Sequence, residues 1–199
     1  MENQPYLSVI IPCYNEEKTI GKTLLAVEQY LKKQDFSYEI LVVSDGSRDI
    51  TAEVAAGMQK SIAGLRLIDN KENHGKGWGV RQGMLEAQGR IRLFMDADNA
   101  TTINHFDKMR PCFEKSCDVV IGSRDAKDAK GAKQAVAQSF LKRQFGNAGN
   151  ILIQIFAVWG IWDTQCGFKA FSARAAQEIF SRCKIDRWGF DIEALALAR

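Results

Sequence analysis

The chain has 199 residues, of which 46% are hydrophobic, 26% charged and 10% aromatic. This composition is typical of one folded globular domain and excludes a disordered, collagen-like or coiled-coil chain. The 27 Lys and Arg against 24 Asp and Glu give a net charge of +3, which is too small for the basic surface that binds a nucleic acid backbone. We therefore expect a single domain over residues 1–199 and no nucleic acid partner.

The cysteines and the chain ends indicate the compartment. Five cysteines without a C-x-x-C pair predict free thiols in a reducing compartment and no zinc site. Residues 1–5 are polar, and the apolar run at 7–11 is shorter than the core of a secretory signal, so a cytoplasmic protein is expected. The sequence stops inside an apolar helical pattern at 193–198 with no stop signal, which indicates truncation at the C-terminus.

Five short apolar runs predict buried strands, and segments with helical spacing separate them. The predicted strands are 7–11, 39–43, 65–68, 91–95 and 119–121, and the predicted helices are 20–31, 52–62, 80–87 and 106–113. This alternation predicts an α/β fold with a mostly parallel central sheet flanked by helices. Five strands are too few for an eight-stranded barrel.

Polar segments follow all five predicted strands. They are 12–17, 44–47, 69–77, 96–98 and 122–124. In open α/β sheets, ligands bind beyond the carboxyl ends of the strands. Asn15 and Ser47, taken singly, are explained as turn or cap residues, but the five segments together predict one polar binding edge.

Asp96-Ala97-Asp98 places two carboxylates at the end of the fourth predicted strand. A turn at Ala97 would let both share one cation, because alternate residues of an extended chain otherwise diverge. Mg²⁺ or Mn²⁺ suits such a pair, since these ions take few protein ligands and fill the rest of their shell from a substrate diphosphate. The alternative is a pair of solvated turn aspartates.

Two further strand ends have chemistry suited to a nucleotide. Residues 75–79, Gly-Lys-Gly-Trp-Gly, precede a helix, where backbone amides and a lysine can meet an anion, although a flexible turn explains them almost as well. The spacing is not that of a phosphate-binding Walker A loop. Asp45, beside Gly46, can accept a hydrogen bond from a base or ribose, or can simply belong to a turn.

The segment 132–162 is a candidate membrane-surface helix. Six basic and two acidic residues lie between Arg124 and Arg143, and the following residues are rich in Ile, Phe and Trp. This pattern is typical of a helix on an anionic lipid surface, and a core helix is the equal alternative. The apolar stretch at 151–162 is too short to span a bilayer.

Two clusters carry no chemistry that their spacing alone defines. They are Asp163-Thr-Gln-Cys-Gly-Phe-Lys169 and Arg187-Trp-Gly-Phe-Asp-Ile-Glu193, and we interpret both as structural loops. No Ser or Cys is spaced so as to pair with His74 or His105 as a nucleophile, so we expect no catalytic role for either histidine.

The motifs together resemble the family 2 glycosyltransferases of GT-A fold. The resemblance covers nearly the whole chain, and the segments 163–169 and 187–193 make it similar to the dolichyl-phosphate β-glucosyltransferases and their polyprenyl-phosphate relatives. It implies a nucleoside contact set, a donor-pocket set, a metal pair and two catalytic residues. The nucleoside contacts would be Pro12, Tyr14, Glu16 and Asp45, and the donor pocket would be shaped by Gly75, Lys76 and Gly77. Asp96 and Asp98 would hold the metal, and Asp96 would also contact the donor. Arg124 would face the acceptor phosphate, and Asp163 is the candidate base.

Three residues depart from the family pattern. Ser44 replaces a first Asp, so one nucleoside contact is missing or replaced. Lys184 stands where processive members have Gln, which argues against a polymerising synthase. Asn99-Ala100 lacks the additional metal-binding Gln that some mannosyl-phosphate synthases have.

The resemblance implies an inverting, Mg²⁺- or Mn²⁺-dependent transfer of glucose from UDP-glucose to a dolichyl or polyprenyl phosphate, at the cytoplasmic face of a membrane. A phosphate with a second pKa of about 6 is already ionised at neutral pH, so it needs positioning more than a base such as Asp163. The alternatives are a mannosyl-phosphate synthase using GDP-mannose and a non-catalytic nucleotide-sugar-binding module. A nucleotidyltransferase is disfavoured because residues 12–17 contain no Gly-rich loop with Arg and Lys.

Overall fold

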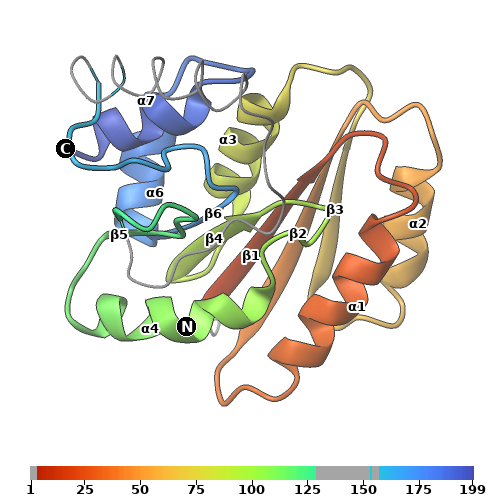
Figure 1. The fold of residues 1–199 in the computed structure, drawn as a ribbon. Helices are drawn as coiled ribbons and strands as arrows, with labels where there is room; N and C mark the ends of the chain where they lie inside the picture. Colours follow the sequence, from red (N-terminus) through yellow and green to blue (C-terminus); the bar gives the residue numbers. More distant parts are fainter. Residues whose placement is uncertain (1–3, 129–152, 154–156) are drawn as a thin grey trace.

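The computed structural model of the protein describes residues 4–128, 153 and 157–199. Within them, six strands form one sheet with the order β3-β2-β1-β4-β6-β5 (Figure 1). The strands are β1 (Leu7–Cys13), β2 (Tyr38–Asp45), β3 (Leu65–Asn70), β4 (Ile91–Met95), β5 (Val119–Ile121) and β6 (Phe168–Ser172). The helices are α1 (Ile20–Leu31), α2 (Thr51–Met58), α3 (Lys76–Glu86), α4 (Phe106–Glu114) after a short 3₁₀ turn (Ile103–His105), α6 (Ala173–Phe180) and α7 (Phe190–Leu197).

The sheet is mostly parallel, as predicted. β1 pairs in parallel with β2 and β4, and β2 pairs in parallel with β3. β6 is antiparallel to both β4 and β5, so β5 runs in the same direction as β1–β4. The carboxyl ends of β1–β5 therefore share one edge, and β6 begins at that edge.

All five predicted strands are present, but β6 and α6 were not predicted, and the loop interpretation of the two clusters is confirmed only for residues 163–167 and 187–189. Phe168 and Lys169 begin β6 rather than ending a loop, and Phe190–Glu193 form the first turn of α7. β6 (Phe-Lys-Ala-Phe-Ser) has only three apolar residues, which Lys169 separates, so no apolar run marks it. The helical pattern at 193–198 is confirmed by α7, which begins earlier than that pattern, at Phe190.

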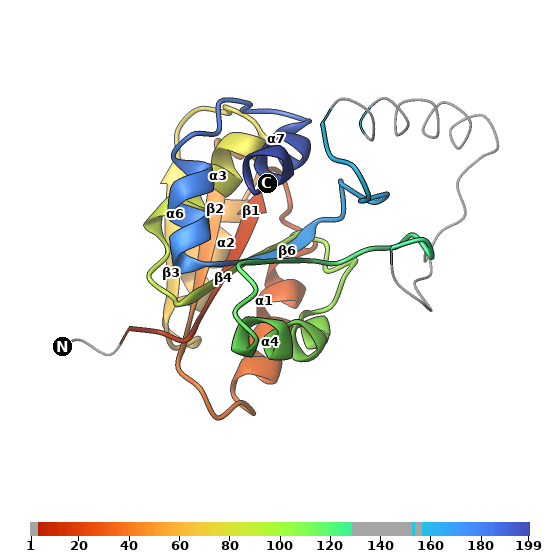
Figure 2. The same cartoon turned by 90° about the vertical axis from the view of Figure 1, so that its left-hand side faces the viewer.

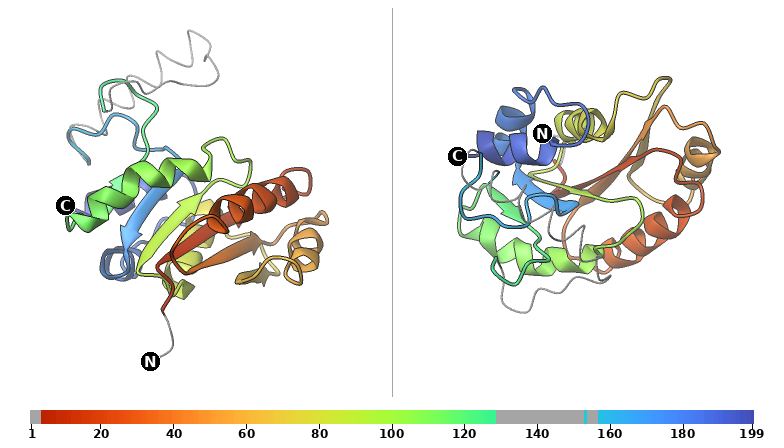
Figure 3. Two further views of the ribbon diagram at one scale, coloured as in Figure 1. Left: turned by 90° about the horizontal axis from the view of Figure 1, so that it is seen from below. Right: turned by 45° about the horizontal axis from the view of Figure 1, so that its top comes forward.

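Two hydrophobic cores lie on opposite faces of the sheet (Figures 1 and 2). Val9 and Ile11 face the core under α1, α2 and α4, whereas Ile10 and Phe94 face the core under α3, α6 and α7. Figure 3 shows the same division of helices from two further sides. Burial on both faces explains why β1, β2 and β4 have mostly apolar sequences rather than alternating ones.

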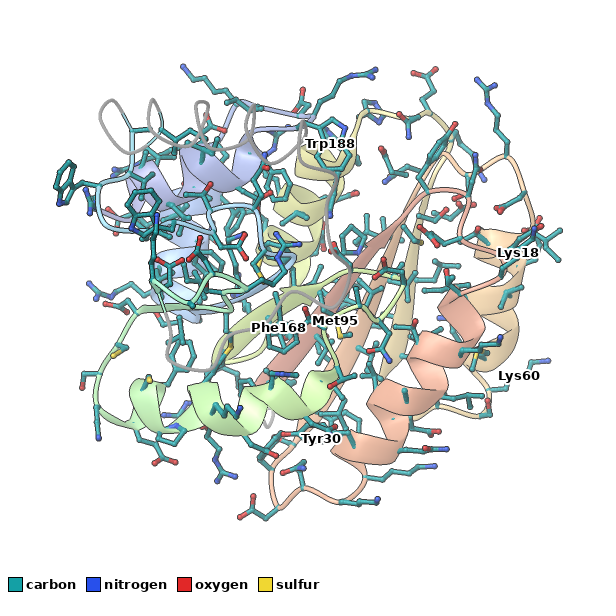
Figure 4. All side chains as sticks on the ribbon, in the orientation of Figure 1. Lys18, Tyr30, Lys60, Met95, Phe168 and Trp188 are labelled. Atoms are coloured by element: carbon teal, nitrogen blue, oxygen red, sulfur yellow. The ribbon has the colours of Figure 1, made fainter. Side chains whose placement is uncertain are left out.

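The pairing of β4 with β6 brings a later part of the chain to the polar edge. Met95 pairs with Phe168 in the register, and their side chains lie together in Figure 4. Residues just before Phe168 consequently lie beside Asp96, the residue that follows Met95.

The predicted membrane-surface segment 132–162 lies largely outside the described residues. No helix among the residues that the structure does describe is both long and apolar enough to cross a membrane. The five cysteines are unpaired, as their spacing predicts.

Candidate functional site

A pocket of about 450 Å³ opens at the carboxyl edge of the sheet. Its walls come from the ends of β1, β2 and β4, the start of α3 and the loop before α7. Most of the predicted donor and metal residues line it, namely Pro12, Tyr14, Glu16, Asp45, Gly75, Lys76, Asp96 and Asp98. Gly77, Arg124 and Asp163 are the predicted residues that do not line it.

The loops after β1 and β2 are fastened to each other at the pocket rim. The Asn15 side-chain oxygen accepts from the Arg48 amide at 2.8 Å, and the Asn15 amide donates to Ser47 Oγ at 3.2 Å. The Glu16 amide donates to Thr51 Oγ1 at 2.7 Å. Asn15 and Ser47 therefore have the turn roles expected of them singly, and they hold Tyr14, which is 41% exposed, at the mouth of the pocket.

Asp45 has a nearly buried carboxylate at the end of β2. It accepts hydrogen bonds from the His74 amide at 3.1 Å and from the Gly75 amide at 2.6 Å. The carboxylate thus fixes the loop that leads into α3 as well as lining the pocket. Ser44 is fully buried and donates to Ser47 Oγ, so the residue that departs from the family pattern does not line the pocket.

The start of α3 packs tightly against the loop before α7. Gly75 has a φ of 118°, and a Cβ there would lie 2.6 Å from the Asp186 carbonyl oxygen. The Trp78 amide donates to the same oxygen at 2.9 Å. This close approach requires glycine, and it brings Arg187 and Trp188 to the pocket.

Gly77 has a different position from the one predicted. It is buried against the backbone of Ile185 and does not line the pocket. The family resemblance placed it in the donor pocket with Gly75 and Lys76, but a helix turns successive residues to different sides.

Asp96 and Asp98 lie on a turn, as their spacing requires if they are to act together. The Asn99 amide donates to the Asp96 carbonyl at 3.2 Å, which turns the chain at Ala97, and both carboxylate residues line the pocket. Lys76 Nζ donates to Asp96 Oδ1 at 2.5 Å and lies 5.7 Å from the centre of the Trp188 ring.

The donor atoms at this turn fit a divalent cation that is bound together with a substrate. Among the described residues, no group of three or more His, Cys, Asp or Glu side chains could hold a metal. Mg²⁺ is commonly bound through one or two carboxylates, with substrate phosphates and waters completing the shell. Asp96 and Asp98 supply two such carboxylates on a pocket that also contains Lys76.

Arg124 and Asp163 form a separate ion pair at the same edge of the sheet. Arg124 donates from its Nε and Nη2 atoms, and from its amide, to the Asp163 carboxylate, with all three distances at 2.8 Å. Burial alone would raise the pKa of Asp163, but the hydrogen bonds and charge of Arg124 outweigh it and hold the pKa below its ordinary value. Asp163 is therefore ionised, and its carboxylate is already paired with the Arg124 guanidinium.

Sequence reasoning missed two groups near the pocket. Arg187 and Trp188 line it directly, and Trp188 is 78% exposed (Figure 4). Lys169 and Asp191 form a buried ion pair. The adjacent basic and aromatic residues could have indicated the role of Arg187 and Trp188. No feature of the nearby sequence indicated that Lys169 pairs with Asp191.

The chain belongs to glycosyl transferase family 2, because the family profile matches residues 8–180. It is 39% identical to the dolichyl-phosphate β-glucosyltransferase of Drosophila melanogaster over 214 residues, which cover 100% of this chain and 64% of the fly protein. It is 34% identical to the human protein of the same name, with 97% of this chain and 63% of the human protein covered. The chain thus spans less than two thirds of the length of these relatives.

Solved structures confirm the GT-A fold. Glucosyl-3-phosphoglycerate synthase from Mycobacterium tuberculosis, solved with Mn²⁺, UDP and glucosyl-3-phosphoglycerate, has a TM-score of 0.65 at 19% identity, over 96% of this chain and 64% of its own. The mannosyltransferase PcManGT from Pyrobaculum calidifontis, solved with GDP-Man and Mn²⁺, has a TM-score of 0.55 at 19% identity, over 87% of this chain and 46% of its own.

Proposed function

We propose that this chain is the catalytic domain of an inverting glycosyltransferase that transfers glucose from UDP-glucose to a dolichyl or polyprenyl phosphate. The observation that carries the proposal is the pocket, in which Asp45 from β2, Lys76 from α3 and the Asp96–Asp98 turn after β4 line one cavity of about 450 Å³. The names of the relatives that align along the whole chain support the choice of sugar and acceptor.

The donor lies in this pocket with its nucleoside toward β1 and β2. Tyr14 offers an exposed aromatic ring there, and Asp45 offers acceptor oxygens that two backbone amides already orient. Pro12 and Glu16 complete that wall of the pocket. The oriented carboxylate oxygens of Asp45 favour a nucleobase or a ribose over an anion, because a buried hydrogen-bond acceptor selects ligands that donate a hydrogen bond to it.

The diphosphate lies at the other wall, where Asp96, Asp98 and Lys76 meet. Asp96 and Asp98 would hold a Mg²⁺ or Mn²⁺ ion, and such an ion would supply positive charge to stabilise the leaving nucleoside diphosphate. The Lys76 ammonium is in place to orient the same phosphates, because it lies 2.5 Å from Asp96. Gly75 lets the loop before α7 pack closely against the start of α3, which places Arg187 and Trp188 at the pocket.

The acceptor phosphate is positioned by Arg124. A phosphate monoester with a second pKa of about 6 is a ready nucleophile at neutral pH, so orientation and charge balance matter more than proton removal. Arg124 is about half exposed and uses only part of its guanidinium on Asp163, which leaves N–H groups for a phosphate oxygen.

Asp163 acts by orienting Arg124. A general base is most effective with a pKa near the working pH, but the pKa of Asp163 lies below its ordinary value because Arg124 binds the ionised form. The Asp163 amide is in turn held by Asp128 Oδ2 at 2.8 Å. We therefore assign Asp163 a positioning role in place of the base role that the resemblance implied.

A lipid-linked acceptor requires contact with a membrane or micelle. We propose that the protein binds peripherally at the cytoplasmic face, with the segment 132–162 as the contact. Trp159, at the described end of this segment, is 70% exposed, and exposed Trp is typical of the membrane interface.

The proposal is tested by transfer of radiolabelled glucose. The chain is incubated with UDP-glucose, polyprenyl phosphate in detergent micelles and Mn²⁺, and label is counted in the organic extract. We expect a labelled lipid with the wild type and none with Asp96→Asn. Label from GDP-mannose alone would instead identify a mannosyl-phosphate synthase, and nucleotide binding without transfer of either sugar would identify a non-catalytic binding module.

A further inference from the structure

A buried ion pair lies behind the pocket. Lys169 is fully buried and Asp191 is 6% exposed, and Lys169 Nζ lies 2.5 Å from Asp191 Oδ1. The same ammonium donates to the Cys166 carbonyl at 2.5 Å and lies 5.3 Å from the centre of the Phe94 ring. Apolar residues in place of a buried ion pair are often neutral or stabilising, so this pair calls for an explanation other than stability.

On one side, the pair supports the Asp96 carboxylate. Lys169 fixes the Cys166 carbonyl, and the next residue, Gly167, accepts the Asp96 amide at 3.2 Å. A Cβ on Gly167 would collide with the Asp96 carboxylate group. The backbone that Lys169 holds is therefore the surface against which Asp96 rests.

On the other side, the pair anchors the wall of the pocket that contains Trp188. Asp191 is in the first turn of α7, directly after the loop that supplies Arg187 and Trp188 to the pocket. Burial raises the pKa of Asp191, and the charges of Lys169 and Lys76 oppose that rise, so the pair shares an electrostatic environment with the pocket.

We propose that Lys169 and Asp191 are positioning residues that lock β6 to α7 and thereby hold the Asp96 carboxylate and the Arg187–Trp188 loop in the geometry that binds the metal-diphosphate end of the donor. This inference rests on the proposed function. It predicts that loss of the pair weakens metal-dependent nucleotide binding even where the fold stays stable.

The test compares binding with stability in three variants. Lys169→Met with Asp191→Leu replaces the pair by apolar side chains of similar size, Asp191→Asn keeps the volume and an acceptor oxygen, and Arg66→Met is the control. Arg66 pairs with the nearly buried Glu39 at 2.9 Å, and neither residue lines the pocket. Calorimetry gives the Kd for UDP with Mn²⁺, and thermal unfolding gives Tm.

We expect the double variant to keep a Tm near that of the wild type while its Kd for UDP with Mn²⁺ rises at least about tenfold, as is usual when support of a metal ligand is lost. Asp191→Asn should raise the Kd in the same direction by a smaller factor. Arg66→Met should lower Tm without changing the Kd.

The outcomes separate this inference from the function on which it rests. A wild-type chain that binds UDP with Mn²⁺, together with a folded double variant or a folded Asp191→Asn of unchanged Kd, would overturn the positioning role and leave the proposed function intact. A wild-type chain that binds neither UDP nor UDP-glucose with Mn²⁺ would overturn both.

Discussion

Arg124 and Asp163 form a forked ion pair in which Nε and Nη2 of the guanidinium each lie 2.8 Å from a different carboxylate oxygen. Two parallel hydrogen bonds fix the plane of the guanidinium as well as its position. The backbone amide of Arg124 donates to the same carboxylate. Asp163 therefore restrains the arginine that we assign to the acceptor phosphate.

Asp163→Asn should weaken acceptor use without changing the pH profile. Loss of a charge-assisted fork is worth a factor of about ten, so we expect the KM for polyprenyl phosphate to rise about tenfold with a smaller change in kcat. The acid limb of kcat/KM should remain, since it belongs to the acceptor phosphate, whose second pKa is about 6. Steady-state kinetics between pH 5 and 8 measure this. An acid limb that vanishes in Asp163→Asn would restore the base role.

The same pair makes a prediction for stability against pH. The pKa of Asp163 is lower in the folded protein than in the unfolded chain, so its contribution is fully present above the unfolded value of about 3.9 and is lost as pH falls through the lower folded value. The stability difference between wild type and Asp163→Asn, measured by urea unfolding, should stay constant from pH 5 to 8. A difference that disappears as pH falls from 7 to 5 would contradict the lowered pKa.

Gly167→Ala should disable the donor site by a steric effect. The added Cβ would collide with the Asp96 carboxylate, so we expect the Kd for UDP with Mn²⁺ to rise at least about tenfold, as when a metal ligand is disturbed. Gly57→Ala, in the exposed part of α2, is the matched control because nothing lies within 4 Å of its Cβ. That variant should bind normally and gain about 0.5–1 kcal/mol of stability. Normal binding by Gly167→Ala would show that Asp96 is not needed in its present position.

Lys76→Met should raise the KM for UDP-glucose with little effect on Tm. The lysine lines the pocket beside Asp96 and is 30% exposed, and a partly exposed ion pair contributes about 1 kcal/mol or less to stability. We expect the KM to rise about tenfold through loss of a charge-assisted phosphate contact. Lys32→Met, which breaks the pair between the exposed Lys32 and the nearly buried Glu28 at 2.8 Å, should leave the KM unchanged. Equal effects from both variants would exclude a specific phosphate contact by Lys76.

The thiols should differ in their reactivity toward iodoacetamide. Burial raises the pKa of Cys13 to about 12, so at pH 8 this pocket residue stays protonated and unreactive. Cys117 is exposed and should be alkylated first, without loss of UDP binding, because it does not line the donor pocket. Mass mapping of labelled peptides over time checks the order. Early labelling of Cys13 would contradict its burial.

The sequence predicted the parallel part of the fold because burial on both faces of a sheet leaves mostly apolar runs, as in Leu7–Ile11 and Ile91–Met95. It did not predict β6, whose second residue is Lys169. The counter-charge of that buried lysine comes from Asp191, 22 residues further along the chain. An ion pair between residues this far apart in the sequence cannot be predicted from the pattern of neighbouring residues.

Most pocket residues could be predicted because they directly follow strands, and the carboxyl ends of parallel strands meet at one edge. Gly77 could not be placed, since its neighbour is the backbone of Ile185. The position of Trp188 could not be predicted for the same reason, because only the packing of its loop against Gly75 brings it to the pocket. The fork between Arg124 and Asp163 is also a tertiary contact, and it changed the role that we assign to Asp163.

The central claim is that the strand-end pocket binds UDP-glucose through a metal held by Asp96 and Asp98. Calorimetric titration of UDP-glucose into the wild type and Asp98→Ala, each with and without Mn²⁺, tests it most directly. Asp98 is exposed on the pocket, so its replacement should leave the fold unchanged. We predict binding by the wild type only with Mn²⁺ and none by the variant. Equal binding by both proteins, or binding that does not depend on Mn²⁺, would contradict the account.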